Sequence, residues 1–302
     1  MIDRPIGLIG APTSAGAYAP GQEDAPSALR DAGLVLRLRD AGFDVVDLGD
    51  TPRFRWRPDR EAPRAMHAGA VRAAALAVGD RVADALAREL LPVVVGGDCT
   101  VELGTVLGWQ RRRDATSLVY CDPHPDLNTP DTVPDGAFDW MGMAHLLGEP
   151  GARRELAALG DRVPALTPGE VLLFGYARAR ATAAERDAVA RQAIRVVEQA
   201  DVAHDPVGAA RRALEWAHDR GSFLLHLDAD SIDFADLPIA ENTDRNVGLS
   251  FEAVAAALDV LLASPQLGAL TITEINPHHG EPDGATLRRF LDRIVSAFAS
   301  PR

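Results

Sequence analysis

The chain has 302 residues, 47% of them hydrophobic and 25% charged, which is enough apolar sequence for one large α/β domain over residues 1–302. It carries 44 acidic residues against 31 basic ones, all arginine, and the net charge of −13 argues against nucleic acid or an anionic membrane as partner. Two cysteines do not make a disulfide framework, and we find neither a secretory signal nor an apolar run of membrane-spanning length, so we expect a cytoplasmic protein.

Apolar runs typical of buried strands alternate along the chain with alanine-rich helical patterns. In chain order we predict strands at residues 6–9, 44–48, 92–95, 117–121, 170–174, 194–197, 222–227 and 268–275. The predicted helices cover residues 25–41, 63–88, 101–112, 182–192, 207–220, 251–263 and 284–299, and we interpret 11–25 and 125–144 as loops near a site. Strands that are apolar on both faces and joined by helices predict an α/β fold with a doubly wound, mostly parallel sheet.

Three short acidic segments each follow one of the predicted strands: GGDCT (96–100), DPHPD (122–126) and DADSID (228–233). Glu274 likewise stands at the end of the last predicted strand. Ligands of parallel α/β sheets bind outside the carboxyl ends of the strands, which is where all four positions lie. Carboxylates gathered with a histidine or cysteine repel one another unless a cation compensates their charge. The pattern therefore predicts a metal cluster.

The spacing within these segments favours side chains that converge. In DPHPD the two aspartates and the histidine alternate with prolines, so period-two geometry puts them on one side of the backbone, and the first two aspartates of DADSID are spaced in the same way. Carboxylates with one imidazole suit manganese or magnesium, whereas a thiolate favours iron, cobalt or zinc. The potential metal ligands are Cys99, Asp122, His124, Asp126, Asp228 and Asp230.

In this order the three segments resemble the motifs of the ureohydrolase (arginase) family, which are GGDH followed by Ser or Ala, DAHxD, and DxDxxDP. The resemblance extends to residues 9–12, 21–34 and 274–277, and the opening segments are closer in pattern to arginase than to agmatinase. It implies a three-layer α/β/α fold with an eight-stranded sheet and two divalent metal ions, in the first place Mn²⁺. It also implies a small guanidino or formimino substrate and a homo-oligomer, trimeric or hexameric.

Carried over residue by residue, the family's roles assign ligands to both ions. The first ion would take Cys99, Asp122, Asp126 and Asp228, and the second Asp122, His124, Asp228 and Asp230. The two ions would acidify a shared water, and the hydroxide would attack the guanidinium carbon while Asp126 orients it and relays its proton. Glu274 would hold the guanidinium through a bidentate pair, and the products would be urea and an amine.

Two positions depart from the family pattern in ways that affect this chemistry. Cys99 stands where the family usually has a histidine ligand. We interpret it as a thiolate ligand, and the alternative is a buried thiol that leaves the first metal weak or absent. Asp139 stands near the family's proton-shuttling histidine and is our candidate proton donor; His145 is the alternative, although its helical setting is typical of a packed histidine. We interpret His226 as a core histidine that points away from Asp228.

Other departures concern the far end of the substrate. Asn128 matches the family's contact to the amino-acid carboxylate, but two further positions hold Val133 and Asp135, and an aspartate there would repel a carboxylate. The family's acidic contacts to the α-amino group are missing around Arg178 and Arg180, where an arginine could instead receive an acidic group. The candidate substrate-binding residues are Asn128, Asp135 and Glu274.

The predicted enzyme therefore cleaves the guanidinium C–N bond of arginine or a modified arginine, such as an N-hydroxylated one, to urea or hydroxyurea plus an amine. An agmatinase-like or a formiminoglutamase-like hydrolase is an alternative. A second class of alternative is a non-catalytic metal-binding family member, suggested by Cys99 and the missing histidine. The retained carboxylates and Glu274 favour the enzyme.

Overall fold

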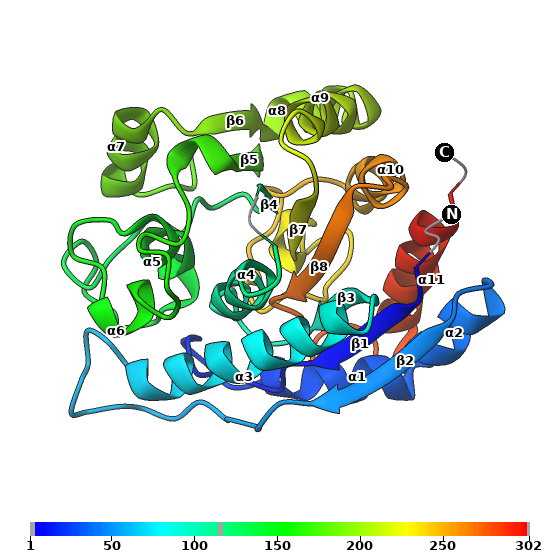
Figure 1. Cartoon of the computed structure of the whole chain (residues 1–302), viewed down its shortest axis with the longest axis horizontal. Helices are drawn as coiled ribbons and strands as arrows, with labels where there is room; N and C mark the ends of the chain where they lie inside the picture. The colour runs from blue at the N-terminus through cyan, green and yellow to red at the C-terminus, as the bar shows by residue number, and fades with distance from the viewer. Residues whose placement is uncertain (1–3, 114–116, 301–302) are drawn as a thin grey trace.

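The computed structural model describes residues 4–113 and 117–300, whose strands form one eight-stranded sheet with the order β2-β1-β3-β8-β7-β4-β5-β6 (Figure 1). Every neighbouring pair is parallel. The predicted sheet is therefore confirmed. The strands are β1 (Ile6–Gly10), β2 (Val45–Asp50), β3 (Leu91–Val95), β4 (Leu118–Cys121), β5 (Val171–Tyr176), β6 (Arg195–Glu198), β7 (Phe223–Asp228) and β8 (Leu267–Thr273).

Each predicted helix has a counterpart, and the structure adds the short helices α5, α6 and α8, which were not predicted because so few residues show no clear helical period. The helices are α1 (Ala25–Asp31), α2 (Leu34–Asp40), α3 (Ala68–Ala87), α4 (Val101–Gln110), α5 (Gly142–Leu147), α6 (Arg154–Ala157), α7 (Ala183–Gln192), α8 (Gln199–His204), α9 (Pro206–His218), α10 (Phe251–Leu262) and α11 (Ala285–Ala299).

Some predicted boundaries were wrong. The single helix predicted over residues 25–41 is divided into α1 and α2 at Gly33, whose φ of 91° lies in the left-handed region. The helix predicted over 63–88 begins only at Ala68, after His67 with a φ of 57°. The loop predicted over 125–144 ends earlier, because residues 139–141 form a 3-10 turn that leads into α5.

Helices cover both faces of the sheet, which gives the three layers seen in Figure 1. Along β3 the side chains alternate between two apolar cores. Leu91, Val93 and Val95 belong to the core that includes residues of α1, α2, α9, α10 and α11, whereas Val94 belongs to the core with residues of α3, α4 and α5. Burial on both faces explains why the strands are continuous apolar runs in the sequence.

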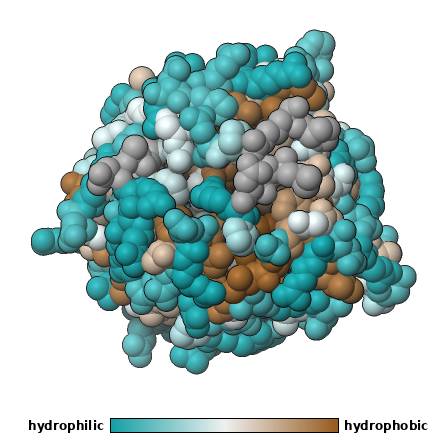
Figure 2. Space-filling model, turned by 45° about the vertical axis from the view of Figure 1, so that its right-hand side comes forward, coloured by the Kyte–Doolittle hydropathy of each residue, from teal (hydrophilic) through white to brown (hydrophobic). Residues whose placement is uncertain are grey.

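The surface agrees with the charged composition. On the face shown in Figure 2, hydrophilic residues predominate and hydrophobic residues gather in a smaller area near its middle. Across residues 4–113 and 117–300, no helix combines the length and the apolar character that crossing a membrane requires.

The sheet order explains how segments far apart in the sequence meet. The four central strands are β3, β8, β7 and β4, and each leads at its carboxyl end into one of the four positions singled out in the sequence: GGDCT, Glu274, DADSID and DPHPD. Because all strands are parallel, the four ends lie side by side on one edge of the sheet. The predicted ligands therefore lie close together because the strands that carry them are adjacent and parallel.

Candidate metal and substrate site

Two consecutive glycines turn the chain after β3 and direct Cys99 toward the centre of this edge. Gly96 and Gly97 have φ angles of 90° and 84°, and a Cβ on Gly97 would lie 2.5 Å from a methyl group of Val101. Only glycine fits such a turn without strain. The turn leaves Cys99 Sγ 3.1 Å from Asp228 Oδ2, so the thiol meets a carboxylate that comes from β7.

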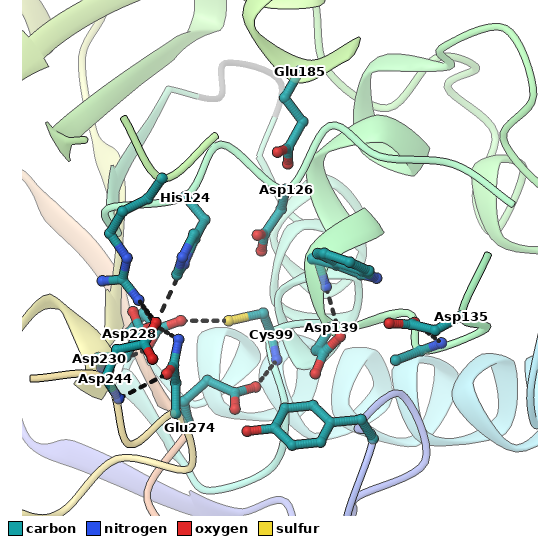
Figure 3. Close-up of a pocket in the computed structure, with 15 residues that line it drawn as sticks. Cys99, His124, Asp126, Asp135, Asp139, Glu185, Asp228, Asp230, Asp244 and Glu274 are labelled. Carbon is teal, nitrogen blue, oxygen red and sulfur yellow. Dashed lines mark hydrogen bonds and ion pairs between the residues drawn. The ribbon is translucent and has the colours of Figure 1, made fainter. Parts of the chain in front are cut away.

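The segment after β4 supplies a carboxylate and an imidazole that face β7. The Nδ1 atom of His124 lies 3.3 Å from Asp122 Oδ1 and 3.4 Å from Asp230 Oδ2. Asp126 has a φ of 50°, an uncommon conformation for an aspartate, and its Oδ2 accepts a hydrogen bond of 2.5 Å from the Tyr120 hydroxyl. The close-up in Figure 3 shows His124 and Asp126 directed into the same space as Cys99.

The ends of β7 and β8 add Asp228, Asp230 and Glu274 to the side chains at this edge. Together with Cys99, Asp122, His124 and Asp126 they form one cluster. Asp228 Oδ1 accepts the backbone N–H of Asp230 at 2.6 Å, which fixes one carboxylate relative to the other. Glu274 follows β8 with a φ of 60°; its Oε1 accepts the backbone N–H of Cys99 at 2.9 Å, and its Oε2 accepts the side-chain amide of Gln22. Two contacts from separate segments thus hold the Glu274 carboxylate in place.

The cluster carries uncompensated negative charge. Burial, reinforced by neighbouring carboxylates, raises the pKa values of Asp126, Asp228 and Glu274 well above their usual range. Burial alone would lower the pKa of His124, but the negative charges around it, chiefly that of Asp230, raise its pKa to about 9. Both effects show that positive charge at this position would be stabilising, and divalent cations provide it.

Among residues 4–113 and 117–300, two groups of side chains fit metal ions, and they share Asp122. The ligand atoms of Cys99, Asp122 and His226 all lie within 4.8 Å of one another, and the same holds for Asp122, His124 and Asp230. Asp122 Oδ2 and Asp230 Oδ1 are buried without a hydrogen-bond partner among the described residues. Since unpaired buried carboxylate oxygens are costly, these atoms suit metal coordination. The residues fit two neighbouring divalent ions.

His226 is a candidate ligand that we missed in the sequence. We expected its side chain to point away from that of Asp228, and this expectation was wrong. Residues two apart in a strand share a face, and the structure shows His226 Nε2 3.5 Å from Cys99 Sγ. The period-two rule that indicated the other candidate ligands would have indicated His226 as well.

A cavity of about 380 Å³ opens beside the cluster. In the part of the chain that the structure describes, its wall contains eight carboxylates but only one arginine, Arg180, so it favours positively charged ligands. Of the predicted metal ligands only Asp122, which is buried, is not part of the wall. The lining residues are Tyr18, Cys99, His124, Asp126, Asp135, Ala137, Asp139, Trp140, Arg180, Glu185, Asp228, Asp230, Asn242, Asp244 and Glu274 (Figure 3).

Of two loop residues predicted to act on the substrate, Asp139 lines the cavity and Asn128 does not. Asp139 lines the cavity, and burial together with the charge of Asp98 raises its pKa well above the usual range. Asn128 is fully buried and does not line the cavity; its Oδ1 accepts hydrogen bonds from the hydroxyls of Thr182 (2.9 Å) and Thr132 (3.3 Å). The side-chain amide of Asn128 therefore holds two loops together instead of facing a substrate, contrary to our expectation.

His145, the alternative proton donor, is a packed histidine. Its Nδ1 lies 2.6 Å from the carbonyl oxygen of Met141, and its Nε2 accepts the backbone N–H of Arg153 at 3.0 Å. Both ring nitrogens are thus occupied when the ring is neutral. Burial lowers the pKa of His145 to about 4.

The two arginines of the segment after β5 also differ. Arg178 is exposed and is not part of the cavity wall, whereas Arg180 lines the cavity. The Nη2 atom of Arg180 lies 3.4 Å from Asp230 Oδ2 and 3.7 Å from Asp244 Oδ2. Arg180 is therefore the residue available to an acidic group on a ligand.

The other lining residues that sequence reasoning missed are Tyr18, Ala137, Trp140, Glu185, Asn242 and Asp244. Several come from irregular loops, and loop residues carry no periodic pattern that would show which way they face. The available signals were the two loops interpreted as lying near a site: residues 11–25 contain Tyr18, and residues 125–144 contain Ala137 and Trp140.

Comparisons with known proteins agree with one another. A sequence model described as the arginase family matches residues 4–298. The arginase of Bacillus subtilis (strain 168) is 28% identical over 302 residues, covering 97% of this chain and 98% of the relative, and that of Brevibacillus brevis is 29% identical over 282 residues, covering 91% and 92%. The solved structure of arginase from Bacillus caldovelox superposes with a TM-score of 0.89 at 26% identity, covering 98% of both chains.

Proposed function

The chain belongs to the arginase family, and on this premise we propose that it cleaves the guanidinium C–N bond of arginine or an N-hydroxylated arginine. The products would be urea or hydroxyurea and an amine. At the coarser level the protein is a metal-dependent amidinohydrolase, as expected for a hydrolase of the ureohydrolase type. The observation that carries the proposal is the buried Glu274 carboxylate, which borders the cavity directly beside the metal-ligand cluster.

The metal centre would use the residues gathered at the ends of β3, β4 and β7. The predicted ligands are Cys99, Asp122, His124, Asp126, Asp228 and Asp230. The carboxylate oxygens of this set favour manganese. The Cys99 sulfur favours iron, cobalt or zinc, which are the alternatives. When bound, two divalent cations supply Lewis acidity and lower the pKa of a water molecule to near neutrality.

Glu274 would orient the guanidinium group. A carboxylate has about four lone-pair sites, and the contacts from Cys99 and Gln22 use two of them. The remaining two sites suit the paired N–H groups of a guanidinium, whose planar fork matches a carboxylate. Because Cys99 belongs to the metal-ligand cluster, a group held by Glu274 is presented to that cluster.

Two aspartates would move protons. Asp126 has one oxygen fixed by the Tyr120 hydroxyl, which leaves its other oxygen to accept a proton from the attacking water. Asp139 lines the same cavity and has a raised pKa, which suits a group that donates a proton to the leaving amine near neutral pH. These roles divide the two proton transfers between separate carboxyl groups.

The charges farther out in the cavity suit an amino-acid head group. Arg180 can pair with an α-carboxylate, and carboxylates such as Asp135, Asp244 and Glu185 can pair with an α-ammonium group. The excess of carboxylates also favours a second candidate, agmatine or another guanidine without a carboxylate. The third candidate is a formimino compound with a distal acid, because Arg180 could pair with that acid.

A substrate panel tests the proposal. Metal-loaded protein should release urea from arginine, or hydroxyurea from N-hydroxyarginine, faster than it releases urea from agmatine or formamide from a formimino amino acid. A preference for agmatine would replace the first candidate by the second. Failure to release urea or hydroxyurea from any guanidine, with the metal content verified, would overturn the proposed activity.

A variant separates the enzyme from a non-catalytic family member. Asp126→Asn should lower both the metal content and urea release, because the amide neither binds a divalent ion well nor accepts the proton. Asp131→Asn, in an exposed residue of the same loop, is the matched control. If Asp126→Asn changed neither property, the residue would have no part in a metal centre. The absence of urea release from the wild-type protein at verified metal content would leave the non-catalytic alternative.

A further inference from the structure

We infer that His226 is a ligand of the first metal ion, paired with Cys99 and oriented by Glu102, and that this site therefore selects a softer cation than its neighbour. The inference rests on the proposed metal dependence and adds a ligand and a metal preference to it. Neither Glu102 nor His226 has a part in the mechanism described above.

The position of His226 supports the assignment. The residue lies in β7, its side chain is fully buried, and its ring stacks on that of Tyr120 with centroids 4.2 Å apart and an interplanar angle of 13°. Its Nε2 faces Cys99 Sγ at 3.5 Å and Thr273 Oγ1 at 3.2 Å. Packing and stacking thus fix the direction of this nitrogen without any bound ion.

Glu102 supplies the arrangement that metal-binding histidines usually have. It lies in α4, is 2% exposed, and its Oε2 is 3.2 Å from His226 Nδ1. When Nδ1 carries the hydrogen and donates it to Glu102, the lone pair of Nε2 is directed toward Cys99. Metal-ligating histidines characteristically donate their second N–H to a carboxylate in this way, and that contact orients the ring and raises its basicity.

The spacing of the donor atoms fits a metal ion between them. Typical metal–sulfur and metal–nitrogen distances of about 2.3 and 2.0–2.1 Å place a sulfur and a nitrogen about 3.5 Å apart at a tetrahedral angle. The separation of Cys99 Sγ and His226 Nε2 is 3.5 Å. Asp122 offers an oxygen within 4.8 Å of both atoms, and Asp228 Oδ2 lies 3.1 Å from the sulfur.

The two halves of the centre are then chemically different. Sulfur, imidazole and carboxylate at the first position favour zinc, cobalt or ferrous iron, whereas the neighbouring group of Asp122, His124 and Asp230 favours manganese. Cys99 alone would supply only a sulfur donor. With His226 beside it, the first position gains both donor types.

Cobalt provides a test that does not depend on turnover. Protein stripped of metal and reloaded anaerobically with Co²⁺ should show sulfur-to-cobalt charge-transfer absorption, which Cys99→Ser abolishes and Cys121→Ser, in the other buried cysteine, does not. His226→Gln should lower cobalt affinity at the first position at least 10-fold and shift the absorption. Glu102→Gln should lower that affinity about 10- to 100-fold, because the amide oxygen is a weaker, uncharged acceptor for the Nδ1 hydrogen that orients the ring.

His145→Gln is the matched control, since it also replaces a buried histidine by an amide but lies outside the cluster. Unchanged cobalt affinity and absorption in His226→Gln would overturn the inference. If that variant does not fold, anomalous diffraction from the cobalt-loaded wild-type protein decides. An ion bonded to both Cys99 Sγ and His226 Nε2 supports the assignment, and an ion not bonded to Nε2 refutes it. These readouts stand even if no guanidine is hydrolysed, so failure of the proposed activity and failure of this assignment are distinguishable.

Discussion

Glu274→Gln should abolish most of the activity while leaving the fold and the metal centre intact. The carboxylate would make two charge-assisted hydrogen bonds to a guanidinium, each worth about 1.5–3 kcal/mol. The amide keeps one acceptor and turns the other atom into a donor that opposes an N–H of the substrate. We therefore expect a loss of about 3 kcal/mol in transition-state binding, or on the order of 100-fold in kcat/KM.

The fold should tolerate this substitution because Gln22 can adapt to it. The side-chain N–H of Gln22 now donates to Glu274, while Gln22 Oε1 is buried without a partner among the described residues. Rotating the Gln22 amide would present that oxygen to the new N–H group. Metal content and the unfolding midpoint should thus stay close to those of the wild type.

The assay is urea or hydroxyurea release at several substrate concentrations, with metal per chain measured on the same samples. Asp244→Asn is the matched control, because its side chain also lines the cavity but is 69% exposed, so its loss should cost about 1 kcal/mol or less. A kcat/KM for Glu274→Gln within a few-fold of the wild type, at equal metal content, would refute the role of Glu274 in holding the guanidinium.

Three further predictions follow from single contacts. Arg180→Gln should raise KM for arginine about 10-fold or more and leave KM for agmatine unchanged or lower, and an equal effect on both substrates would show that Arg180 meets no carboxylate. His145 remains neutral in the folded protein down to a pKa of about 4, but in the unfolded chain it binds a proton below about 6.5. Stability should therefore fall by about 3 kcal/mol as the pH drops through that interval, a slope that His145→Gln removes in denaturant titrations; the same slope in both proteins would assign it to other groups. Gly97→Ala should lower the free energy of unfolding by about 2 kcal/mol or more, because of its φ of 84° and the close contact with Val101. Gly69→Ala, where a Cβ meets nothing within 4 Å, should not; equal values for the two variants would contradict the strained-turn explanation.

The sheet and the position of most candidate ligands at one edge of it could be predicted because both depend on strong local patterns. The strands are buried on both faces and therefore read as apolar runs, and the acidic segments follow four of them directly. Parallel pairing then forces their carboxyl ends onto one edge. The order of the strands was not predicted, and it is this order that places the four segments side by side.

The surroundings of Cys99 were only partly predicted. We expected Cys99 to act as a metal ligand, but we assigned His226 to the core although it shares a face with Asp228. The contact between His226 and Glu102 joins β7 to α4, residues 124 positions apart, and no sequence pattern indicates such a pairing.

The cavity wall was the least predictable part. Tyr18, Asn242 and Asp244 lie in segments without regular secondary structure, and the direction of their side chains depends on loop conformation. Asn128 was expected to face the substrate by resemblance, but hydroxyls of Thr132 and Thr182 engage its side chain in this fold. The resemblance predicted the positions of side chains at strand ends better than the positions of side chains in loops.

The central claim is that this protein is a metal-dependent hydrolase of a guanidino compound. The most direct test is to compare urea and hydroxyurea release by metal-stripped protein and by the same protein reloaded with Mn²⁺, over arginine, N-hydroxyarginine and agmatine. We predict release only after reloading, with arginine or N-hydroxyarginine as the better substrate. Equal release by both preparations, or none from any guanidine at full metal occupancy, would contradict the claim.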